Sequence, residues 1–418
     1  MKFTLSWLQD YLATKAPLED ILATMLKAGL EVEHVEDPAE KLSEFTVAHV
    51  TAAEPHPDAD RLRVCTVETK DGTRQIVCGA PNARAGMTAI YAPLGTYIPG
   101  LDFSLDKKPR KIRGIESYGM LCSTKEIEAG EDSDGIADLE GDWPVGTPAA
   151  EALGLTDKII DFEVTPNRPD WLGVQGIARD LAAAGAGRFI ENPIKKVEGS
   201  YDCPVDIQLE APEACPVFAG ALVRGVTNGP SPEWMQQRLK ALGITPRSLL
   251  VDITNYISYD RARPLHAYDA AKLKGAVTAR LGKAGEKLEA IDGKTYDLGD
   301  EMCVIADESG PIGLGGVMGG QSTAVSAETT DVFIESAWFD PTRTARTGRD
   351  TGIISDARYR FERGVDPQSC MDGLNFALML IKEYGGGEVS HAKVAGQPPA
   401  PQPKVLFDRR DVPRLTGL

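Results

Sequence analysis

The chain has 418 residues, 42% of them hydrophobic and 26% charged, which is too long for a single core and predicts two to four domains. A net charge of −17 argues against indiscriminate binding to nucleic acid, because a polyanion is repelled at long range, but it leaves a local contact open. No apolar run approaches the roughly 20 residues of a membrane span, and seven scattered cysteines without C-x-x-C spacing predict reduced thiols in a cytoplasmic protein without structural zinc.

One amphipathic helix is predicted near the N-terminus, with Gly29 placed to end it. Its apolar face comprises Leu18, Ile21, Leu22, Met25 and Leu26. Residues 151–195 return to a helical pattern after a long stretch without one. We therefore expect residues 1–39 and 151–195 to form one small α/β domain that is interrupted by an insertion.

The intervening residues 40–150 contain short strands broken by Gly, Pro, Asn and Asp, which predicts a small β-barrel of about five strands. This segment holds the run KKPRKIR, which has five basic residues in seven positions: Lys107, Lys108, Arg110, Lys111 and Arg113. Two interpretations remain open for the run, a solvated turn and a contact with phosphate groups.

Residues 200–395 are predicted to form a larger mixed α/β unit, in which Ser231-Pro232-Glu233 opens a helix and Gly243 closes it. Residues 396–404 read as a linker, since four prolines cannot join a helix or a central strand. Residues 405–418 begin like a strand and a helix and then stop. We interpret them as the start of a further, truncated domain.

Three segments of this larger unit are predicted to be walls of one site. Residues 251–269 are a strand-like segment with a polar Thr254-Asn255 pair, followed by His266. The sequence GLGGVMGG at 313–320 predicts a tight turn, and FIESAWF at 333–339 places Glu335 within an apolar run. Two interpretations without a functional role stay open: a Glu335 side chain that faces solvent on alternate strand positions, and a His266 side chain that serves a structural role.

Many short strings of the chain, taken in order and over essentially its whole length, resemble the β subunit of bacterial phenylalanyl-tRNA synthetase. They are MKFTLSWLQDYL, HPDADRLRVCTV, IVCGAPN, IRGIESYGMLCS, TPNRPDWLGVQGIARDLA, VDITNY, RPLHAYD, GGVMGG, FIESAWF and RFERGVDP. The resemblance implies a multidomain α+β protein: a tRNA-binding barrel of the oligonucleotide-binding class inserted in a small α/β domain, followed by an editing-type domain.

The same resemblance implies hydrolysis of tyrosine wrongly esterified to tRNA(Phe), because a hydrophobic pocket rejects an added hydroxyl by only about 10²-fold. Glu335 would accept the tyrosyl hydroxyl and act as the specificity residue. His266 would orient water or hold the terminal ribose, with hydrogen bonds from Thr254 and Asn255. Backbone N–H groups around Gly315 and Gly316 would approach the ligand. No Ser/His/Asp set and no histidine pair at metal spacing supports a covalent or metal-dependent hydrolase, so no metal site is predicted.

By the same resemblance, aminoacylation belongs to a separate catalytic α subunit in a heterotetramer of two α and two β subunits. ATP and Mg²⁺ are then expected for the whole synthetase and no cofactor for this fragment. Two alternatives stay open: a non-catalytic scaffold with an inactive editing fold, and a free-standing tRNA-binding protein built on the barrel.

Three places depart from the family's usual residues: Gly315, which would enlarge or loosen its wall, the Arg358-Tyr359 pair, and residues 259–263. In RFERG, Arg360, Glu362 and Arg363 could bond within the domain or with a partner.

Overall fold

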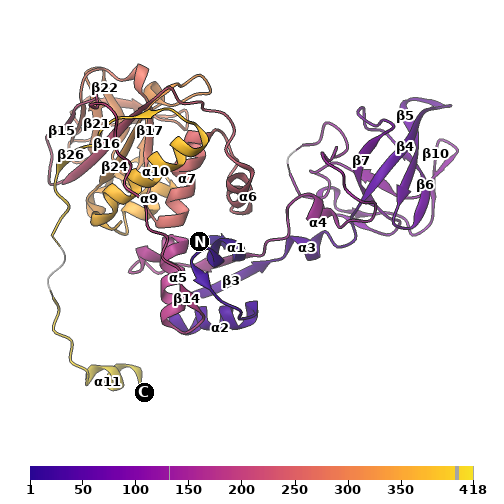
Figure 1. Cartoon of the computed structure of the whole chain (residues 1–418), viewed down its shortest axis with the longest axis horizontal. Coiled ribbons are helices and arrows are strands. Elements are labelled where there is room, and N and C mark those ends of the chain that lie inside the picture. Colours follow the sequence, from indigo (N-terminus) through magenta and orange to yellow (C-terminus); the bar gives the residue numbers. More distant parts are fainter. Residues whose placement is uncertain (131, 401–403, 418) are drawn as a thin grey trace. The chain divides into compact units, whose positions relative to one another are not determined.

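The structure, a computed structural model, describes residues 1–130, 132–400 and 404–417 (Figure 1). The chain divides into two compact units, which are considered separately. The first comprises residues 1–10, 18–163 and 240–243, and the second comprises residues 11–17, 164–239 and 244–418. The predicted division into residues 1–39 with 151–195, 40–150 and 200–395 stays a prediction, and the expected linker lies partly outside the described residues.

The first unit contains a small antiparallel sheet and a larger one. The small sheet has the order β1-β13-β3, and the larger one has the order β12-β7-β4-β5-β6. The elements of this unit are β1 (Lys2–Thr4), α1 (Leu5–Gln9), α2 (Leu18–Ala28), β3 (Glu31–Glu36), α3 (Pro38–Lys41), β4 (Thr46–His56), β5 (Ala59–Thr69), β6 (Gly72–Cys78), β7 (Met87–Ala92), β8 (Tyr97–Ile98), β9 (Phe103–Ser104), β10 (Arg110–Ile112), β11 (Ile115–Ser117), β12 (Met120–Cys122), α4 (Ala149–Ala152) and β13 (Ile159–Glu163).

The five-stranded sheet confirms the expected strands between residues 40 and 150 (Figure 1). Alternate residues of its strands point to one side, and Val50, Cys65, Val67 and Ile76 are buried there. Within the described residues, no ladder of hydrogen bonds joins β12 to β6, so a closed barrel is not shown. Two short hairpins, β8–β9 and β10–β11, lie outside this sheet.

Helix α2 forms where its amphipathic pattern predicts it and ends before Gly29, whose φ of 91° suits glycine. The apolar face is narrower than expected. Ile21 and Met25 are buried, whereas Leu26 is 66% exposed. Including Leu26 in the buried face was therefore wrong.

The second unit is built around two sheets and several helices. One sheet has the order β15-β18-β21-β22-β23, and the other has the order β17-β24-β16-β25, with β26 also paired to β16. The elements of this unit are β2 (Leu12–Ala13), α5 (Val174–Ala183), β14 (Arg188–Phe189), β15 (Ile207–Leu209), β16 (Val217–Arg224), α7 (Leu249–Arg261), β17 (His266–Asp269), β18 (Val277–Leu281), β19 (Lys287–Glu289), β20 (Thr295–Asp297), β21 (Cys303–Asp307), β22 (Gly310–Leu314), β23 (Met318–Gly319), β24 (Asp331–Trp338), α8 (Pro341–Thr351), α9 (Asp356–Phe361), α10 (Cys370–Tyr384), β25 (Glu388–Val389), β26 (Lys393–Gly396) and α11 (Asp411–Thr416). Helix α6 (Glu233–Ala241) precedes Gly243, as predicted.

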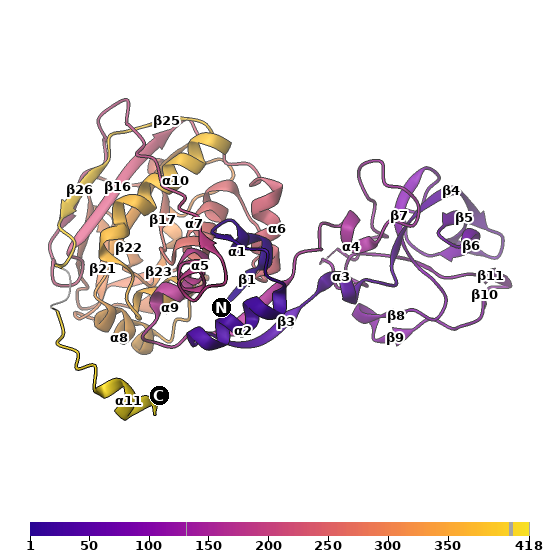
Figure 2. The same cartoon turned by 60° about the horizontal axis from the view of Figure 1, so that its bottom comes forward.

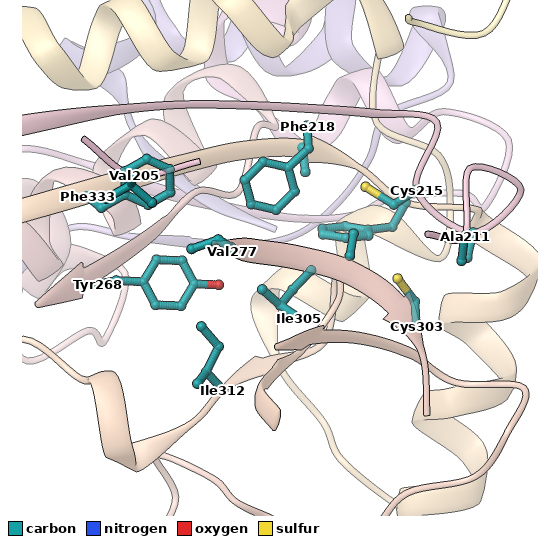
Figure 3. Packing of buried hydrophobic residues seen from close by; sticks show 14 of the residues in the cluster. Val205, Ala211, Cys215, Phe218, Tyr268, Val277, Cys303, Ile305, Ile312 and Phe333 are labelled. Carbon is teal, nitrogen blue, oxygen red and sulfur yellow. The ribbon is translucent and has the colours of Figure 1, made fainter. Parts of the chain in front are cut away.

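The main core of the second unit lies between these two sheets. Phe218 on β16 and Phe333 on β24 share one buried cluster with Ile305 on β21 and Ile312 on β22 (Figure 3). On its other face, the sheet that contains β16 and β24 is covered by α10, which also packs against α7 (Figure 2). The layer order is therefore sheet, sheet, helices.

Helix α7 corrects the expectation of a strand-like segment at the start of residues 251–269. The β-branched composition of VDITNYI suggested a strand. Its buried residues nevertheless follow helical spacing, with Leu249, Ile253, Tyr256 and Ile257 on one side. The helix ends at Arg261, the following residue Ala262 has a left-handed φ of 53°, and only residues 266–269 of this segment form a strand.

Candidate active site

The site is built on the pairing of β17 with β24. These strands are antiparallel, and their register places His266 directly opposite Glu335. Side chains of directly opposed residues lie on the same face of a sheet. Tyr268 is two residues beyond His266 and therefore shares that face. The register thus fixes the three side chains as close neighbours.

Glu335 is buried, with 6% of its surface exposed, so the alternative of a solvent-facing carboxylate is wrong. Its Oε2 accepts a 2.5 Å hydrogen bond from the Tyr268 hydroxyl, and Tyr268 is itself 1% exposed. Burial disfavours the charged carboxylate and raises the pKa of Glu335 to about 7, although the Tyr268 hydrogen bond opposes this rise. The group is therefore balanced between its two protonation states near neutral pH.

His266 is the second polar group of this face. Its ring packs edge-on against Tyr268, with 4.4 Å between ring centroids. Burial lowers the pKa of His266 to about 4, so the imidazole is neutral at pH 7. Its Nε2 is buried and has no hydrogen-bond partner within the part of the chain that the structure describes. A neutral imidazole with one unused nitrogen can hold a water molecule or a ligand hydroxyl.

The glycine-rich turn packs directly on this histidine. A Cβ on Gly319 would lie 2.1 Å from His266 Cε1, so only glycine leaves room for the ring. Gly316 adopts φ 72° in the turn. The Gly315 N–H donates to Cys303 O at 2.9 Å, so the prediction that this N–H is free for a ligand was wrong. The Gly316 N–H has no acceptor among the described residues.

Gly315 does not loosen its wall, contrary to expectation. A Cβ on Gly315 would lie 2.7 Å from Phe339 Cε1 and 2.9 Å from Cys303 Sγ. The space that an alanine methyl group would need is therefore filled by Phe339, whose ring also meets Phe361 edge-on at 5.1 Å.

A narrow cavity of about 60 Å³ is lined by His266, Tyr268, Glu335 and the backbone of residues 313–319. Its other walls include Phe339, Ala357 and Phe361. Phe339 ends the predicted wall segment FIESAWF. Ala357 and Phe361 were not predicted to line the site, since they carry no polar signal that could have identified them. The volume suits a few water molecules and is smaller than a phenol ring needs.

Thr254 and Asn255 are not among the residues that line this cavity. Both lie on α7 and are half-buried. The Thr254 hydroxyl donates to Val251 O at 2.8 Å, within its own helix. The structure therefore brings together His266, Glu335, Gly315 and Gly316, but not the predicted Thr254-Asn255 pair.

The RFERG segment bonds within its own unit. Arg360, which is 1% exposed, donates to Ser258 O at 2.8 Å and stacks on Tyr259. Arg358 Nε donates to Glu362 Oε2 at 2.9 Å and occupies the space beside Gly348, where a Cβ would lie 1.9 Å from that nitrogen. The departure at Arg358 is thus accommodated by a glycine ten residues earlier.

The predicted basic run forms the β10–β11 hairpin and the chain leading into it. Lys107, Lys108, Arg110, Lys111 and Arg113 are all exposed, and the structure pairs none of them with a carboxylate among the residues it describes. Ile112 pairs with Ile115, so Arg113 and Gly114 are the two turn residues, at φ 50° and 89°. An arginine is thereby held at the hairpin tip in a conformation that glycine or asparagine adopts more easily.

In residues 1–130, 132–400 and 404–417, no group of three or more His, Cys, Asp or Glu side chains could hold a metal ion. None of the helices in these ranges has the length and apolar character needed to cross a bilayer.

Comparisons with known proteins match two separate parts of the chain, one that contains the basic run and one that contains His266 and Glu335. A family model described as "B3/4 domain" matches residues 214–386, and one described as "Putative tRNA binding domain" matches residues 45–148. The phenylalanine–tRNA ligase beta subunit of Rhodopseudomonas palustris is 52% identical over 420 residues, which cover 100% of this chain and 52% of that protein. The beta subunit from Mesorhizobium japonicum is 52% identical over 421 residues, with the same coverage.

Among solved structures, an N-terminal fragment of the phenylalanyl-tRNA synthetase beta subunit from Pyrococcus horikoshii is 16% identical, with a TM-score of 0.32. That match covers 63% of this chain and 73% of the other. The chain spans about half the length of the curated relatives it matches.

The folds and matches define a multidomain α+β protein that combines a tRNA-binding domain with a B3/4 domain. Over its whole length, the chain is similar to phenylalanine–tRNA ligase beta subunits at 51–52% identity.

Proposed function

We propose that this chain acts in phenylalanine–tRNA ligase, where it binds tRNA(Phe) and hydrolyses the ester of tyrosine mistakenly attached to it. The observation that carries the proposal is the His266–Glu335 pair, two buried polar groups set opposite each other by strand register. His266 Nε2 is left without a partner in the described chain beside a cavity. A solely structural histidine would be expected to have its buried nitrogen satisfied.

In the proposed reaction, the tyrosyl hydroxyl donates a hydrogen bond to Glu335, which makes Glu335 the specificity residue. A water molecule held by His266 Nε2 attacks the ester carbonyl carbon, and the Gly316 N–H donates to the developing oxyanion. The bond between the carbonyl carbon and the ribose oxygen breaks, and the ribose oxygen takes the proton that the attacking water gives up. The products are tyrosine and tRNA with a free 3′ end.

Two features shape this proposal. The cavity is smaller than a phenol ring, so the substrate must enter with movement of a wall, and Phe339 and Phe361 are the adjacent side chains. Thr254 and Asn255 are assigned only to contacts with the ribose or its neighbours outside the cavity, since they do not line it.

For tRNA binding, we propose that the exposed residues Lys107, Lys108, Arg110, Lys111 and Arg113 contact phosphate groups. Five exposed cations on this hairpin and the chain leading into it, none paired with a carboxylate among the described residues, give a local positive field on a chain whose net charge is −17. The β-strands of residues 40–150 are proposed to belong to the oligonucleotide-binding class.

Charging of tRNA(Phe) is proposed to require a catalytic α subunit, in a cytoplasmic heterotetramer of two α and two β subunits. We propose that ATP and Mg²⁺ are used by the whole synthetase, and no step is assigned to them in this chain.

The test is deacylation of Tyr-tRNA(Phe) by the chain and by its complex with the α subunit. Glu335→Ala and His266→Ala are compared with wild type, and Glu289→Ala, which removes an exposed carboxylate on β19, is the matched control. We expect the first two variants to lose hydrolysis and the control to retain it. If the wild-type protein clears the ester no faster than buffer, the chain is a non-catalytic tRNA-binding scaffold.

A further inference from the structure

The first unit contains a second, larger cavity of about 490 Å³. It lies between the end of β6, the β8–β9 hairpin, the β10–β11 hairpin and β12. Its volume is several times that of the cavity at His266, and it is within the range of pockets that hold small organic groups.

The lining of this cavity combines apolar surface with hydrogen-bonding groups. Phe103, Leu105 and Met120 provide apolar surface, and Phe103 is 40% exposed. Asp106, Glu126 and Asp134 add carboxylates, and serines and glycines form other parts of the wall. Three carboxylates disfavour an anion inside the cavity. They suit a neutral, flat group that carries N–H donors.

The lining of the cavity also includes a cation. Arg110 lines the cavity, and the other four cations of the basic run lie on the same hairpin or on the chain leading into it. An occupant should therefore present a neutral ring to the cavity and anionic groups to the hairpin. A nucleotide within an RNA strand has this distribution, with a base on one side and phosphates on the other.

We propose that this cavity receives one unstacked nucleobase of single-stranded RNA, while the phosphates on either side of that base lie against the β10–β11 hairpin. The inference rests on the proposed tRNA binding and adds to it a specific subsite. Aromatic side chains that stack on bases are a common feature of proteins that bind single strands, and Phe103 supplies such a ring. Paired bases cannot enter, because they remain stacked within the duplex.

The consequence is a preference for unpaired RNA that charge alone does not give. Phosphate contacts by the hairpin would bind single and double strands alike. A base in the cavity adds affinity only for a strand whose bases are free to turn outward. The phosphate contacts can therefore be measured by the salt dependence of binding, and the base contact by the difference in affinity between single-stranded and double-stranded RNA.

The test uses the whole chain and an eight-nucleotide single-stranded RNA with one 2-aminopurine, compared with the same strand in a duplex. Phe103→Ala removes the stacking ring, and Phe103→Leu keeps apolar bulk without it. Tyr97→Ala is the matched control, since Tyr97 is an exposed aromatic residue on the same β8–β9 hairpin but does not line the cavity. Unfolding curves of all three variants establish that they are folded.

We expect both Phe103 variants to lower single-strand affinity roughly tenfold, and to relieve the quenching of 2-aminopurine fluorescence that wild type causes. The salt dependence and the duplex affinity should be unchanged, and Tyr97→Ala should behave as wild type. If wild type binds RNA with the expected salt dependence but the Phe103 variants match it, the base subsite is wrong and tRNA binding stands. If wild type binds neither strand at low salt, both proposals are wrong.

Discussion

The Tyr268 hydroxyl donates a 2.5 Å hydrogen bond to Glu335 Oε2 across the β17–β24 pair. The chain thus supplies its own phenol to the carboxylate that we propose reads the phenol of a substrate. Glu335 keeps this partner when the cavity holds a ligand without a hydroxyl. The penalty against phenylalanine is then smaller than for a wholly unpaired carboxylate, and selectivity depends on the remaining oxygen of the group.

The raised pKa of Glu335 predicts a pH dependence of stability. Its folded-state pKa of about 7 exceeds the ordinary value of 4.5, so folding disfavours the carboxylate form. The contribution of Glu335 to the free energy of unfolding should therefore fall as pH rises from 4.5 to 7, by roughly 3 kcal/mol. Glu335→Gln should abolish this fall and be more stable than wild type at pH 8, as measured by urea unfolding at a series of pH values.

His266 has the opposite effect on the pH dependence of the free energy of unfolding. Its pKa is lowered from 6.5 to about 4, so its contribution to stability is lost as pH falls through this range. Because both proteins contain His266, the difference between their curves isolates Glu335. Parallel curves for wild type and Glu335→Gln would contradict the assignment.

Gly319→Ala should disturb the site without removing any functional group. The new Cβ would lie 2.1 Å from His266 Cε1, so the imidazole must shift. We expect hydrolysis of Tyr-tRNA(Phe) to fall at least about tenfold and the free energy of unfolding to fall by about 1–3 kcal/mol.

Gly313→Ala is the control for this prediction, since its Cβ would meet nothing closer than Met318 O at 3.6 Å. It lies on the same glycine-rich segment and lines the same cavity. Equal hydrolysis rates in the two alanine variants would show that the position of His266 does not matter.

Arg113→Asn should raise stability while it lowers affinity for tRNA. Asparagine tolerates the left-handed φ of 50° better than arginine, which predicts a gain of about 0.5–1 kcal/mol in the free energy of unfolding. Loss of one phosphate contact should reduce the slope of log affinity against log salt by about 1. Lys27→Asn on α2 removes an equally exposed cation and should leave tRNA affinity unchanged. An unaltered salt slope for Arg113→Asn would remove this residue from the interface.

Arg263 should be essential to the second unit because it is a wholly buried cation that satisfies backbone carbonyls. Its Nη1 donates to Ala337 O at 2.6 Å, and its Nη2 donates to Asp366 O. Arg263→Met leaves both carbonyls without this donor and should cost about 2–4 kcal/mol of unfolding free energy. Arg346→Met, at an exposed position on α8, should cost far less, and similar urea midpoints for the two variants would contradict the prediction.

The sequence predicted individual helices and strands better than it predicted the contacts between them. The α2 helix with its stop at Gly29 and the strands of residues 40–150 follow from local patterns. The sequence predicted that His266 and Glu335 belong to walls of one site but not that they lie directly opposite each other, because nothing local encodes the register of strands almost 70 residues apart. The Tyr268 partner of Glu335 was missed for the same reason.

Composition also misled where it competed with periodicity. The β-branched residues of α7 suggested a strand, and that placed Thr254 and Asn255 beside His266 in the prediction. In the helix, the Thr254 hydroxyl bonds to its own backbone. The cavity walls at Phe339 and Phe361 are apolar and read as ordinary core.

The pairing of β17 with β24 fixes the distance between His266 and Glu335. The separation between the group that we propose recognises the tyrosyl side chain and the group that we propose acts on its ester is set by backbone hydrogen bonds, and loop movement cannot change it. An amino acid with a longer or shorter side chain would place its ester carbonyl at a different distance from His266, even if it reached Glu335. A slip of one residue in either strand would turn that strand's side chain, His266 or Glu335, to the opposite face of the sheet, so the pair depends on this register.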